Sequence, residues 1–450
     1  MSEIIKLKKG LNIRLKGVAE KILSPEIPVT RYGVKPIDFP GLVPKVTVKP
    51  DDNVKAGSVL FTDKQRPEIK ITSPVSGKVV DIVRGERRRL LEVVIEVSGN
   101  DYEDFGKADP ATLTGEQVKE KMLASGLWPV VRQRPYHMIA RPDAEPKSIF
   151  ISGFDTAPLA PDYDFVMHNS DLKEFSTGIQ ALRKLTKGKV NLVLDGSNVT
   201  GSVLKATPDV DIHYVKGPHP AGNVGVQIHH IDPVNKGEVV WYVNLQDVSA
   251  IGRLFNEGHY RHDRIIALTG SDVLRPSYHR VRSGASISGI TKGNINPVEV
   301  RFISGNVLTG TSIAADGFLG YYDNMVTVIP EGRYHEFFGW MTMGFDKFSS
   351  SRTYASSIIP RKEYVMNTNI HGGERAFVLT GVYEKVLPMD ILPMHLLKAI
   401  LVDDIEMMEK LGIYEVAEED FALCEYVCPS KIEIQSIIRK GLDLMVKEMS

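Results

Sequence analysis

The sequence is poor in cysteine, in long apolar runs and in excess charge of either sign. Only two cysteines, Cys424 and Cys428, occur in 450 residues, which excludes a disulfide framework and fits a reducing compartment. No run of roughly 18 apolar residues is present, so we expect no membrane span. The 55 Lys and Arg residues balance 56 Asp and Glu, which leaves no global field to attract nucleic acid.

What is present suits a globular protein of several domains. Apolar residues make up 42% of the chain and charged residues 25%, so there is ample material for buried cores and no compositional sign of disorder. Single cores stop growing well below this chain length, which predicts roughly three domains.

Short strands separated by turns are predicted for residues 27–97. The runs 48–60 and 71–82 combine turn residues with alternating valine and isoleucine. This pattern resembles the barrel-sandwich fold of biotinyl and lipoyl carrier domains, and Lys64 stands where lipoyl domains carry their modified lysine. Pro67 would alter the tight hairpin that presents such a lysine, so we expect the fold without the modification.

A mostly parallel sheet with covering helices is predicted for residues 149–270, up to and including the apolar run 264–270. Before it, Thr114 and Gln117 form a capping box that predicts the start of a helix. Ligands of such sheets bind beyond the carboxyl ends of the strands, which here carry residues 195–197, 216–222 and 244–246. No G-x-G-x-x-G or Walker loop is present, so the usual phosphate-binding signal is missing.

The last third returns to short strands and then to helices. After Arg275 we expect a small β-grasp-like module that ends near Pro330. A linker rich in glycine, serine and aromatic residues follows at 337–354. Apolar residues at helical spacing predict amphipathic helices at 391–411 and 431–449.

The stretch 125–143, S-G-L-W-P-V-V-R-Q-R-P-Y-H-M-I-A-R-P-D, interleaves cationic and aromatic side chains. Such a segment suits an anionic or planar partner. The alternative is a solvated linker whose tryptophan packs on the core, because short basic-aromatic segments are weak evidence alone.

The two cysteines are spaced as the closing part of an iron-sulfur run, C-x-x-x-C-P. A cubane cluster needs four thiolate ligands and this chain holds two, so we expect two ordinary thiols on a helix.

Together these segments resemble one family over essentially the full chain, the A subunit of the sodium-translocating NADH:quinone oxidoreductase. The resemblance is carried by 125–135, by H-P-A-G-N-V-G-V-Q-I-H-H-I-D-P-V at 219–234, by R-F-I-S-G-N-V-L-T-G and D-G-F-L-G-Y-Y-D-N within 301–324, and by the cysteine tail. The family is related to the C subunit of the Rnf ion-translocating complex and to the flavin-bearing NADH subunit of respiratory complex I.

Those relatives bind FMN with a loop like G-G-A-G-F-P, where this chain has S-G-L-W-P at 125–129. A backbone that cradles phosphate needs residues without Cβ at the closest approach, and Leu127 and Trp128 would fill that space. The resemblance therefore implies a redox fold that binds no flavin, iron-sulfur cluster or metal in this chain. The complex as a whole uses NADH, flavins, iron-sulfur centres and quinone.

The implied fold class is α/β and multidomain. A biotinyl/lipoyl-carrier-like β domain occupies 1–100, and a Rossmann-like α/β domain with a degenerate flavin loop occupies 101–270. A β-grasp (SLBB-like) module at 271–335 and a helical C-terminal domain with a vestigial iron-sulfur motif at 336–450 complete the chain.

The implied function is that of a peripheral subunit on the cytoplasmic side of the bacterial inner membrane. Its complex couples NADH oxidation and quinone reduction to sodium export, and its partners are the integral membrane subunits. We expect the isolated chain to be inactive, since no catalytic residues stand out. Two alternatives are a flavin or iron-sulfur electron-transfer subunit of Rnf type and a carrier-domain protein that uses Lys64.

A quinone head group is planar with two carbonyl acceptors, so a site for it needs flat apolar surface and a few donors. Two segments, 31–44 and 128–137, combine these features. We expect quinone or partner contacts from Tyr32, Lys35, Phe39, Trp128, Arg132, Arg134, Tyr136 and His137. The alternative is that both segments pack at protein interfaces, which also enrich arginine and aromatic residues.

Overall fold

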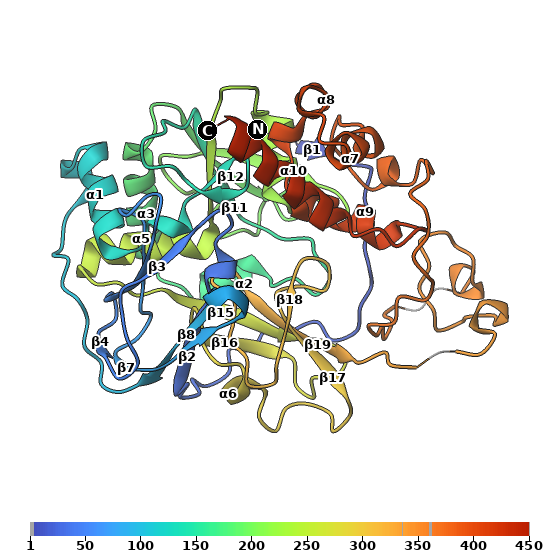
Figure 1. Ribbon diagram of the computed structural model, residues 1–450, viewed down its shortest axis with the longest axis horizontal. Coiled ribbons are helices and arrows are strands. Elements are labelled where there is room, and N and C mark those ends of the chain that lie inside the picture. The colour runs from blue at the N-terminus through green and yellow to red at the C-terminus, as the bar shows by residue number, and fades with distance from the viewer. Residues whose placement is uncertain (1–3, 335, 360–361, 450) are drawn as a thin grey trace.

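Two large sheets form the centre of the molecule, with a smaller β domain on one side and a helical domain above (Figure 1). The computed structural model describes residues 4–334, 336–359 and 362–449.

The central sheet has the strand order β1-β13-β12-β11-β14-β9-β10 among the described residues. Its strands are β1 (Ile4–Lys6), β13 (Asp211–Lys216), β12 (Lys189–Asp195), β11 (Ser148–Ser152), β14 (Val240–Asn244), β9 (Arg132–Arg134) and β10 (Met138–Ile139). The first five run parallel, while β9 and β10 form an antiparallel edge. The predicted, mostly parallel sheet is confirmed, and β1 joins it from the beginning of the chain.

Helices cover both faces of this sheet. Successive residues of a strand point to opposite sides, and both sides carry apolar residues that the helices bury. The helices here are α1 (Gly115–Ser125), α2 (Tyr163–His168), α3 (Leu172–Lys184), α4 (Val224–Ile231) and α5 (Leu245–Glu257). In β11, Ile149 and Ile151 face the core that α3 and α5 share, whereas Phe150 faces Ile228 of α4. The capping box at Thr114 is present at the start of α1, as predicted.

Helices α3 and α5 cross at two glycines. A Cβ on Gly252 would lie 1.7 Å from the carbonyl oxygen of Glu174, and one on Gly178 would lie 2.0 Å from that of Val248. Only residues without a side chain permit this approach. The close crossing holds α5 against the sheet directly after β14 ends.

The second sheet has the order β16-β15-β19-β17-β18. It consists of β16 (Ser277–Arg282), β15 (Asp263–Thr269), β19 (Met325–Pro330), β17 (Val300–Ser304) and β18 (Thr311–Ile313), with α6 (Ser288–Thr291) beside it. The prediction that the run 264–270 continues the central sheet is wrong, since β15 pairs with β16 and β19. The sequence of an apolar strand that is buried on both faces does not indicate which sheet the strand joins. Here the sheet is determined by pairing with β19, about sixty residues further along the chain.

The amino-terminal β domain consists of two small sheets, as the barrel-sandwich prediction requires. One holds β2 (Arg31–Val34), β8 (Leu90–Val97), β7 (Gly77–Arg84) and β4 (Asn53–Val54), and the other β3 (Pro44–Val46), β5 (Val59–Asp63) and β6 (Lys70–Thr72). Phe61, Ile71 and Ile95 are buried between them.

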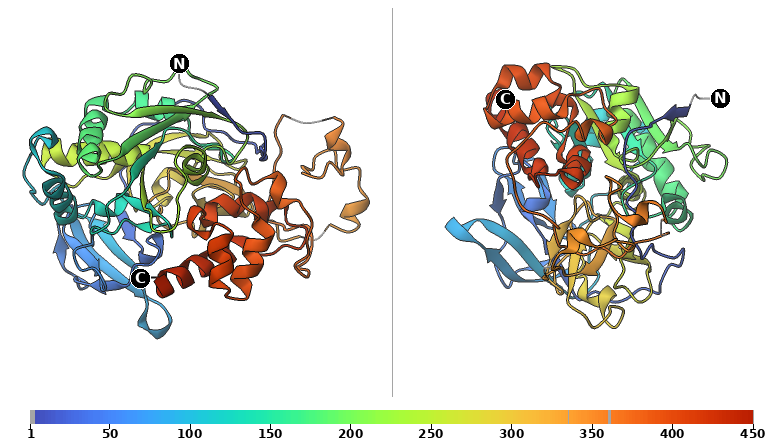
Figure 2. Two further views of the ribbon diagram at one scale, coloured as in Figure 1. Left: turned by 90° about the horizontal axis from the view of Figure 1, so that it is seen from above. Right: turned by 90° about the vertical axis from the view of Figure 1, so that its right-hand side faces the viewer.

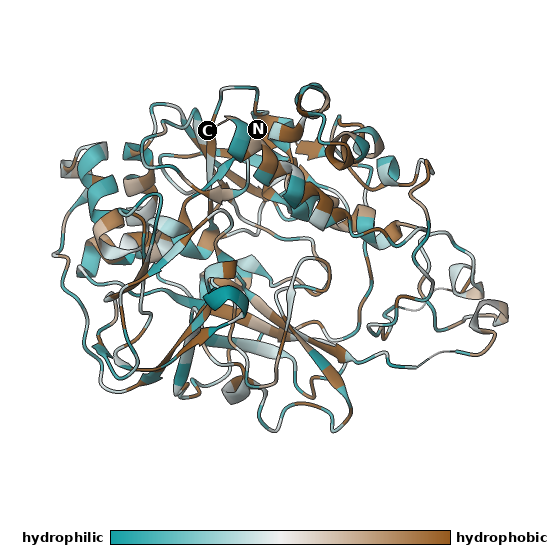
Figure 3. Cartoon of the chain, in the orientation of Figure 1, coloured by the Kyte–Doolittle hydropathy of each residue, from teal (hydrophilic) through white to brown (hydrophobic). Residues whose placement is uncertain are grey.

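The carboxyl-terminal part is helical, as predicted, with α7 (Pro393–Leu401), α8 (Ile405–Lys410), α9 (Ala422–Val427) and α10 (Ile434–Met449). The prediction of a single helix at 391–411 is wrong in one respect, because this segment forms two helices, α7 and α8, with a break between them. Asp403 has a φ of 55° and the side chain of Asp404 accepts a hydrogen bond from the Met407 amide, which caps a new helix. Helix α10 alternates hydrophobic and hydrophilic residues around its axis (Figure 3).

A segment without strands, residues 337–359, extends away from the rest of the molecule and is drawn in orange in Figures 1 and 2. We call it the outlying segment. Its regular structure is limited to two short 3-10 turns, Gly339–Met341 and Ala355–Ser357.

Candidate functional site

The basic-aromatic stretch forms the antiparallel edge of the central sheet. A 3-10 turn, Trp128–Val130, leads into β9, where Arg134 pairs with Val240 and Arg132 with Tyr242 of β14. The two arginines therefore point to the same face. Gln133 points to the other face and accepts a hydrogen bond from the Arg141 amide at 2.8 Å.

Arg132 lies between two tyrosine rings. Its guanidinium carbon is 4.3 Å from the ring centre of Tyr322 and 4.7 Å from that of Tyr242. A cation over a ring face is attracted to it. The hydroxyl of Tyr322 donates to the Pro129 carbonyl at 2.7 Å, which fixes the ring against this stretch.

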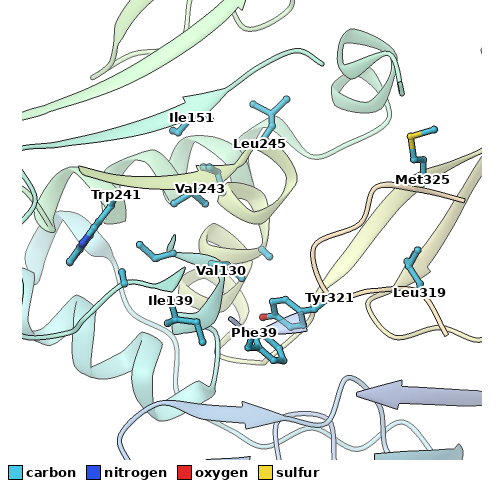
Figure 4. Packing of buried hydrophobic residues seen from close by; sticks show 14 of the residues in the cluster. Phe39, Val130, Ile139, Ile151, Trp241, Val243, Leu245, Leu319, Tyr321 and Met325 are labelled. Carbon is cyan, nitrogen blue, oxygen red and sulfur yellow. The ribbon is translucent and has the colours of Figure 1, made fainter. Parts of the chain in front are cut away.

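Phe39, from the other predicted segment, contacts Tyr322 and its neighbour Tyr321. Its ring centre lies 4.8 Å from that of Tyr321 and 5.8 Å from that of Tyr322, and Figure 4 shows Phe39 beside Tyr321. Segments 31–44 and 128–137, which were predicted separately, therefore both contact the tyrosines of the motif D-G-F-L-G-Y-Y-D-N. Sequence reasoning noted this motif but did not assign it to a site.

A network of charges attaches the stretch to the helical domain. Arg134 donates to Glu419 at 2.8 Å and to Asp420 at 3.1 Å. His137 Nδ1 lies 3.0 Å from a Glu418 oxygen, and Arg439 of α10 donates to the other Glu418 oxygen at 3.1 Å. Three consecutive acidic residues in the sequence were the only signal for these partners.

Burial and charge act against each other on the ionisable groups. Burial lowers the pKa of Arg134, but the carboxylate of Asp420 raises it, and the result lies above the usual range. Burial raises the pKa of Glu418, but His137 and Arg439 bring it below its usual range. Asp38 accepts a hydrogen bond from the Tyr321 amide. Burial of this carboxyl outweighs the attraction of Lys35 and raises the pKa of Asp38 to about 6.

The eight predicted contact residues divide by exposure. Tyr32, Phe39, Trp128 and Arg134 are buried, whereas Lys35, Arg132, Tyr136 and His137 are partly exposed. The indole nitrogen of Trp128 donates to the Ala140 carbonyl at 2.8 Å, and Tyr32 pairs with Ile95 within the β domain. These two side chains lie in packed structure.

A cavity of about 410 Å³ lies between residues 36–44 and α10. We call it the loop–helix cavity. Its volume is within the range of small-molecule sites, about 300 to 1,000 Å³. It is lined by Pro36, Ile37, Phe39, Pro40, Gly41, Leu42, Pro44, Arg89, Leu90, Glu418, Arg439 and Asp443. Flat apolar surface and guanidinium donors thus occur in one place.

Known proteins match the chain over its whole length. Residues 5–98 match the model of the NqrA N-terminal barrel-sandwich hybrid domain, 113–260 that of the NqrA second alpha/beta domain, and 265–315 that of the NQRA C-terminal domain. The A subunit of the Na(+)-translocating NADH-quinone reductase from Hahella chejuensis is 41% identical over 449 residues, which is 99% of this chain and 100% of that protein. The proteins of the same name from Neisseria meningitidis and Yersinia pseudotuberculosis are 41% and 40% identical, each over 99% of this chain and 100% of theirs.

The chain belongs to the family of the A subunits of the Na(+)-translocating NADH-quinone reductase. Two crystal structures of NAD+-reducing NiFe hydrogenase match 49% and 65% of this chain and 50% and 57% of theirs, at 13% and 11% identity. Their TM-scores of 0.35 and 0.36 are too low to support a functional argument.

In this member of the family, the segment 125–129 is buried. Helix α1 ends at Gly126, whose φ is 75°, and a Cβ there would meet the Thr72 side chain at 2.3 Å. Leu127 and Trp128 then enter the core, with 1% and 0% exposure. Their side chains occupy the space next to this backbone, where a phosphate cradle would need open amides.

The cysteines of the family tail are both buried on and beside α9 and form no disulfide. The hydroxyl of Tyr383 donates to Cys428 Sγ at 2.9 Å. Burial raises the pKa of Cys424 above its usual range. Buried, protonated thiols are poor metal ligands and poor nucleophiles.

Proposed function

We propose that this chain is a peripheral subunit on the cytoplasmic face of the bacterial inner membrane, in a complex that couples NADH oxidation and quinone reduction to sodium export. The observation that carries the proposal is the match of about 40% identity along the full length of several named relatives. Within the described residues, no helix is both long and apolar enough to cross a bilayer. Attachment through integral membrane subunits is the arrangement that fits a chain of this kind.

The outlying segment supports attachment through a protein partner. Its exposed large apolar side chains are Phe337, Phe338, Met341, Met343, Phe345, Ile358 and Ile359. Contiguous exposed apolar surface marks interaction sites, and aromatic residues and methionine are enriched at such interfaces. The segment carries few charges, so a bilayer with anionic headgroups has little to attract it electrostatically.

The loop–helix cavity supports quinone handling. Ile37 and Leu42 line it with apolar surface, and Arg439 and Arg89 offer N–H donors for the two quinone carbonyls. The ring of Phe39 is 1% exposed and packs behind this surface against Tyr321. Tyr136 and His137 act behind the cavity, since the Tyr136 carbonyl accepts from Arg439 and His137 pairs with Glu418. Trp128 and Arg134 are fully buried, so we propose that they hold the stretch in place.

We also propose that this chain holds no flavin and no iron-sulfur cluster. Leu127 and Trp128 fill the space beside the flavin-loop backbone, and the two thiols are buried. These observations speak against an electron-transfer subunit of Rnf type, and the full-length match to the A subunits speaks against a carrier-domain protein that uses Lys64. An absorption spectrum of the purified chain should show no flavin or cluster bands, and its intact mass should show no lipoyl or biotin increment.

The experiment is reconstitution on membranes that hold the other subunits but lack this chain. Such membranes should oxidise NADH with ferricyanide and fail to reduce quinone, and purified chain should restore sodium-dependent quinone reduction. A variant with Phe337, Met341 and Met343 changed to serine should bind these membranes poorly. The matched control is Val298→Ser, which removes an exposed apolar side chain outside the outlying segment and should bind normally.

Two results would contradict the proposal. One is quinone reduction that does not respond to the added chain. The other is retention of the chain on protein-free liposomes at physiological salt, since this would make lipid rather than protein the partner.

A further inference from the structure

The central sheet changes its winding direction between β11 and β14. The chain proceeds from β11 to β12 and β13 on one side and then returns to place β14 on the other side of β11. Both strands are parallel, with Ser152 at the end of β11 opposite Asn244 at the end of β14. Open α/β sheets bind ligands in the crevice outside the carboxyl ends of strands at such a point.

A cavity of about 170 Å³ occupies this position. We call it the switch-point crevice. The second sheet and the helical domain close it, through residues 305–309, residues 322–325 and Glu419. It shares no lining residue with the loop–helix cavity, so the two sites can be tested separately.

The charges that line the crevice disfavour an anionic ligand. The carboxylates of Asp155, Asp323 and Glu419 line it, against the single guanidinium of Arg132. Glu419 is paired with Arg134 at 2.8 Å, which still leaves two carboxylates against one cation. Burial lowers the pKa of His219, which also lines the crevice, to about 4, so this ring adds no positive charge at neutral pH.

Helices α4 and α5 begin at the crevice, with Val224 and Asn244 in its lining. Helix amino termini favour negative charge. Here the protein supplies that charge itself through its own carboxylates. A phosphate at this position would face them directly, which is the reverse of a nucleotide phosphate site.

Aromatic side chains form part of the crevice wall, and hydrogen bonds fix one of them. The hydroxyl of Tyr163 accepts hydrogen bonds from the Asn324 amide at 2.8 Å and the Asn244 amide at 3.4 Å. Tyr242, which is 2% exposed, lines the crevice with a hydroxyl that has no hydrogen-bond partner among the described residues. Native proteins seldom leave a buried hydroxyl unsatisfied, so this atom indicates a missing ligand or solvent group.

We propose that the switch-point crevice binds a small planar heterocycle that carries N–H donors and no negative charge, which is the chemistry of a nucleobase. The rings of Phe154 and Tyr163 line the crevice, and the carboxylates of Asp155 and Asp323 accept from ring and exocyclic N–H groups. Its volume of about 170 Å³ lies below the usual range of small-molecule sites, about 300 to 1,000 Å³, so it limits the ligand to a single small ring system.

The test uses the full chain with adenine, adenosine and AMP as probes, by calorimetry and saturation-transfer NMR. Adenine or adenosine should bind with a Kd of about 1 mM or tighter, and AMP at least about fivefold more weakly because its phosphate faces the carboxylates. Asp155→Asn should weaken adenosine about fivefold and reduce the discrimination against AMP. Tyr242→Phe should weaken it about twofold to fivefold.

The matched control is Asp209→Asn, which removes an exposed carboxylate that does not line the crevice and should bind like the parent. Binding of neither adenine nor adenosine at about 5 mM would overturn the proposal. So would AMP bound as tightly as adenosine, a comparison that needs no variant, or an Asp155→Asn variant with unchanged affinities and a parental melting curve.

Discussion

Replacing Arg134 with methionine removes the cation at the centre of the charge network while keeping a side chain of similar length. Both Arg134 and Asp420 are fully buried, and one Asp420 oxygen already lacks a partner among the described residues. Breaking a buried ion pair by removing one partner costs about 3 to 5 kcal/mol. Glu419, whose side chain is 27% exposed, can regain water and limits the cost to the lower part of that range.

The measurement is the free energy of unfolding in urea, followed by the fluorescence of Trp128 and Trp241, which are buried next to this edge of the sheet. Arg333→Met is the matched control, since its ion pair with Glu299 is exposed and should cost less than about 1 kcal/mol. Adding Asp420→Asn to Arg134→Met should recover about 1 to 2 kcal/mol. The reasoning is refuted if Arg134→Met costs no more than Arg333→Met, or if the second change brings no recovery.

Three further predictions concern pH, thiols and a glycine. Because burial raises the pKa of Asp38 to about 6, the parent should lose up to about 3 kcal/mol of stability as pH rises from about 4 to 6. Asp38→Asn should abolish this loss in urea unfolding at pH 4.5 and 8, and an unchanged pH dependence would contradict it. Neither cysteine should react with iodoacetamide in the native protein, whereas both should react in urea; modification of the native protein would refute this. Gly126→Ala should cost about 2 to 3 kcal/mol, because strain and a clash add. Gly106→Ala, with a φ of 73° and nothing within 4 Å, should cost only about 1 kcal/mol, and equal losses would show that the clash is absent.

The sequence predicted those elements whose signal is local. The capping box at Thr114, the amphipathic helix α10 and the turn-separated strands of the β domain depend on neighbouring residues, and each lies where it was predicted. Strand β15 was assigned to the wrong sheet because its partner β19 is distant in the chain. The break between α7 and α8 was missed because apolar periodicity continues across it, and only the capping by Asp404 marks it.

The candidate site was predictable only in part. Arginine and aromatic residues drew attention to segments 31–44 and 128–137, but nothing in the sequence showed that Tyr321 and Tyr322 join them. Nor did it show that Arg134 would be buried against Glu419 and Asp420, which lie 285 and 286 residues away. Contacts at such separations are set by the packing of whole domains.

The most direct test of the account is the ratio of two activities of one reconstituted preparation, quinone reduction by NADH and ferricyanide reduction by NADH. We expect Phe39→Ala, which removes the buried ring that supports the wall of the loop–helix cavity, to raise the KM for quinone about tenfold (~1.4 kcal/mol) while the ferricyanide rate stays at the parental value. Val43→Ala, an exposed residue of the same segment that does not line the cavity, should leave both activities unchanged. If Phe39→Ala assembles normally and reduces quinone with the parental KM and rate, the cavity takes no part in quinone handling.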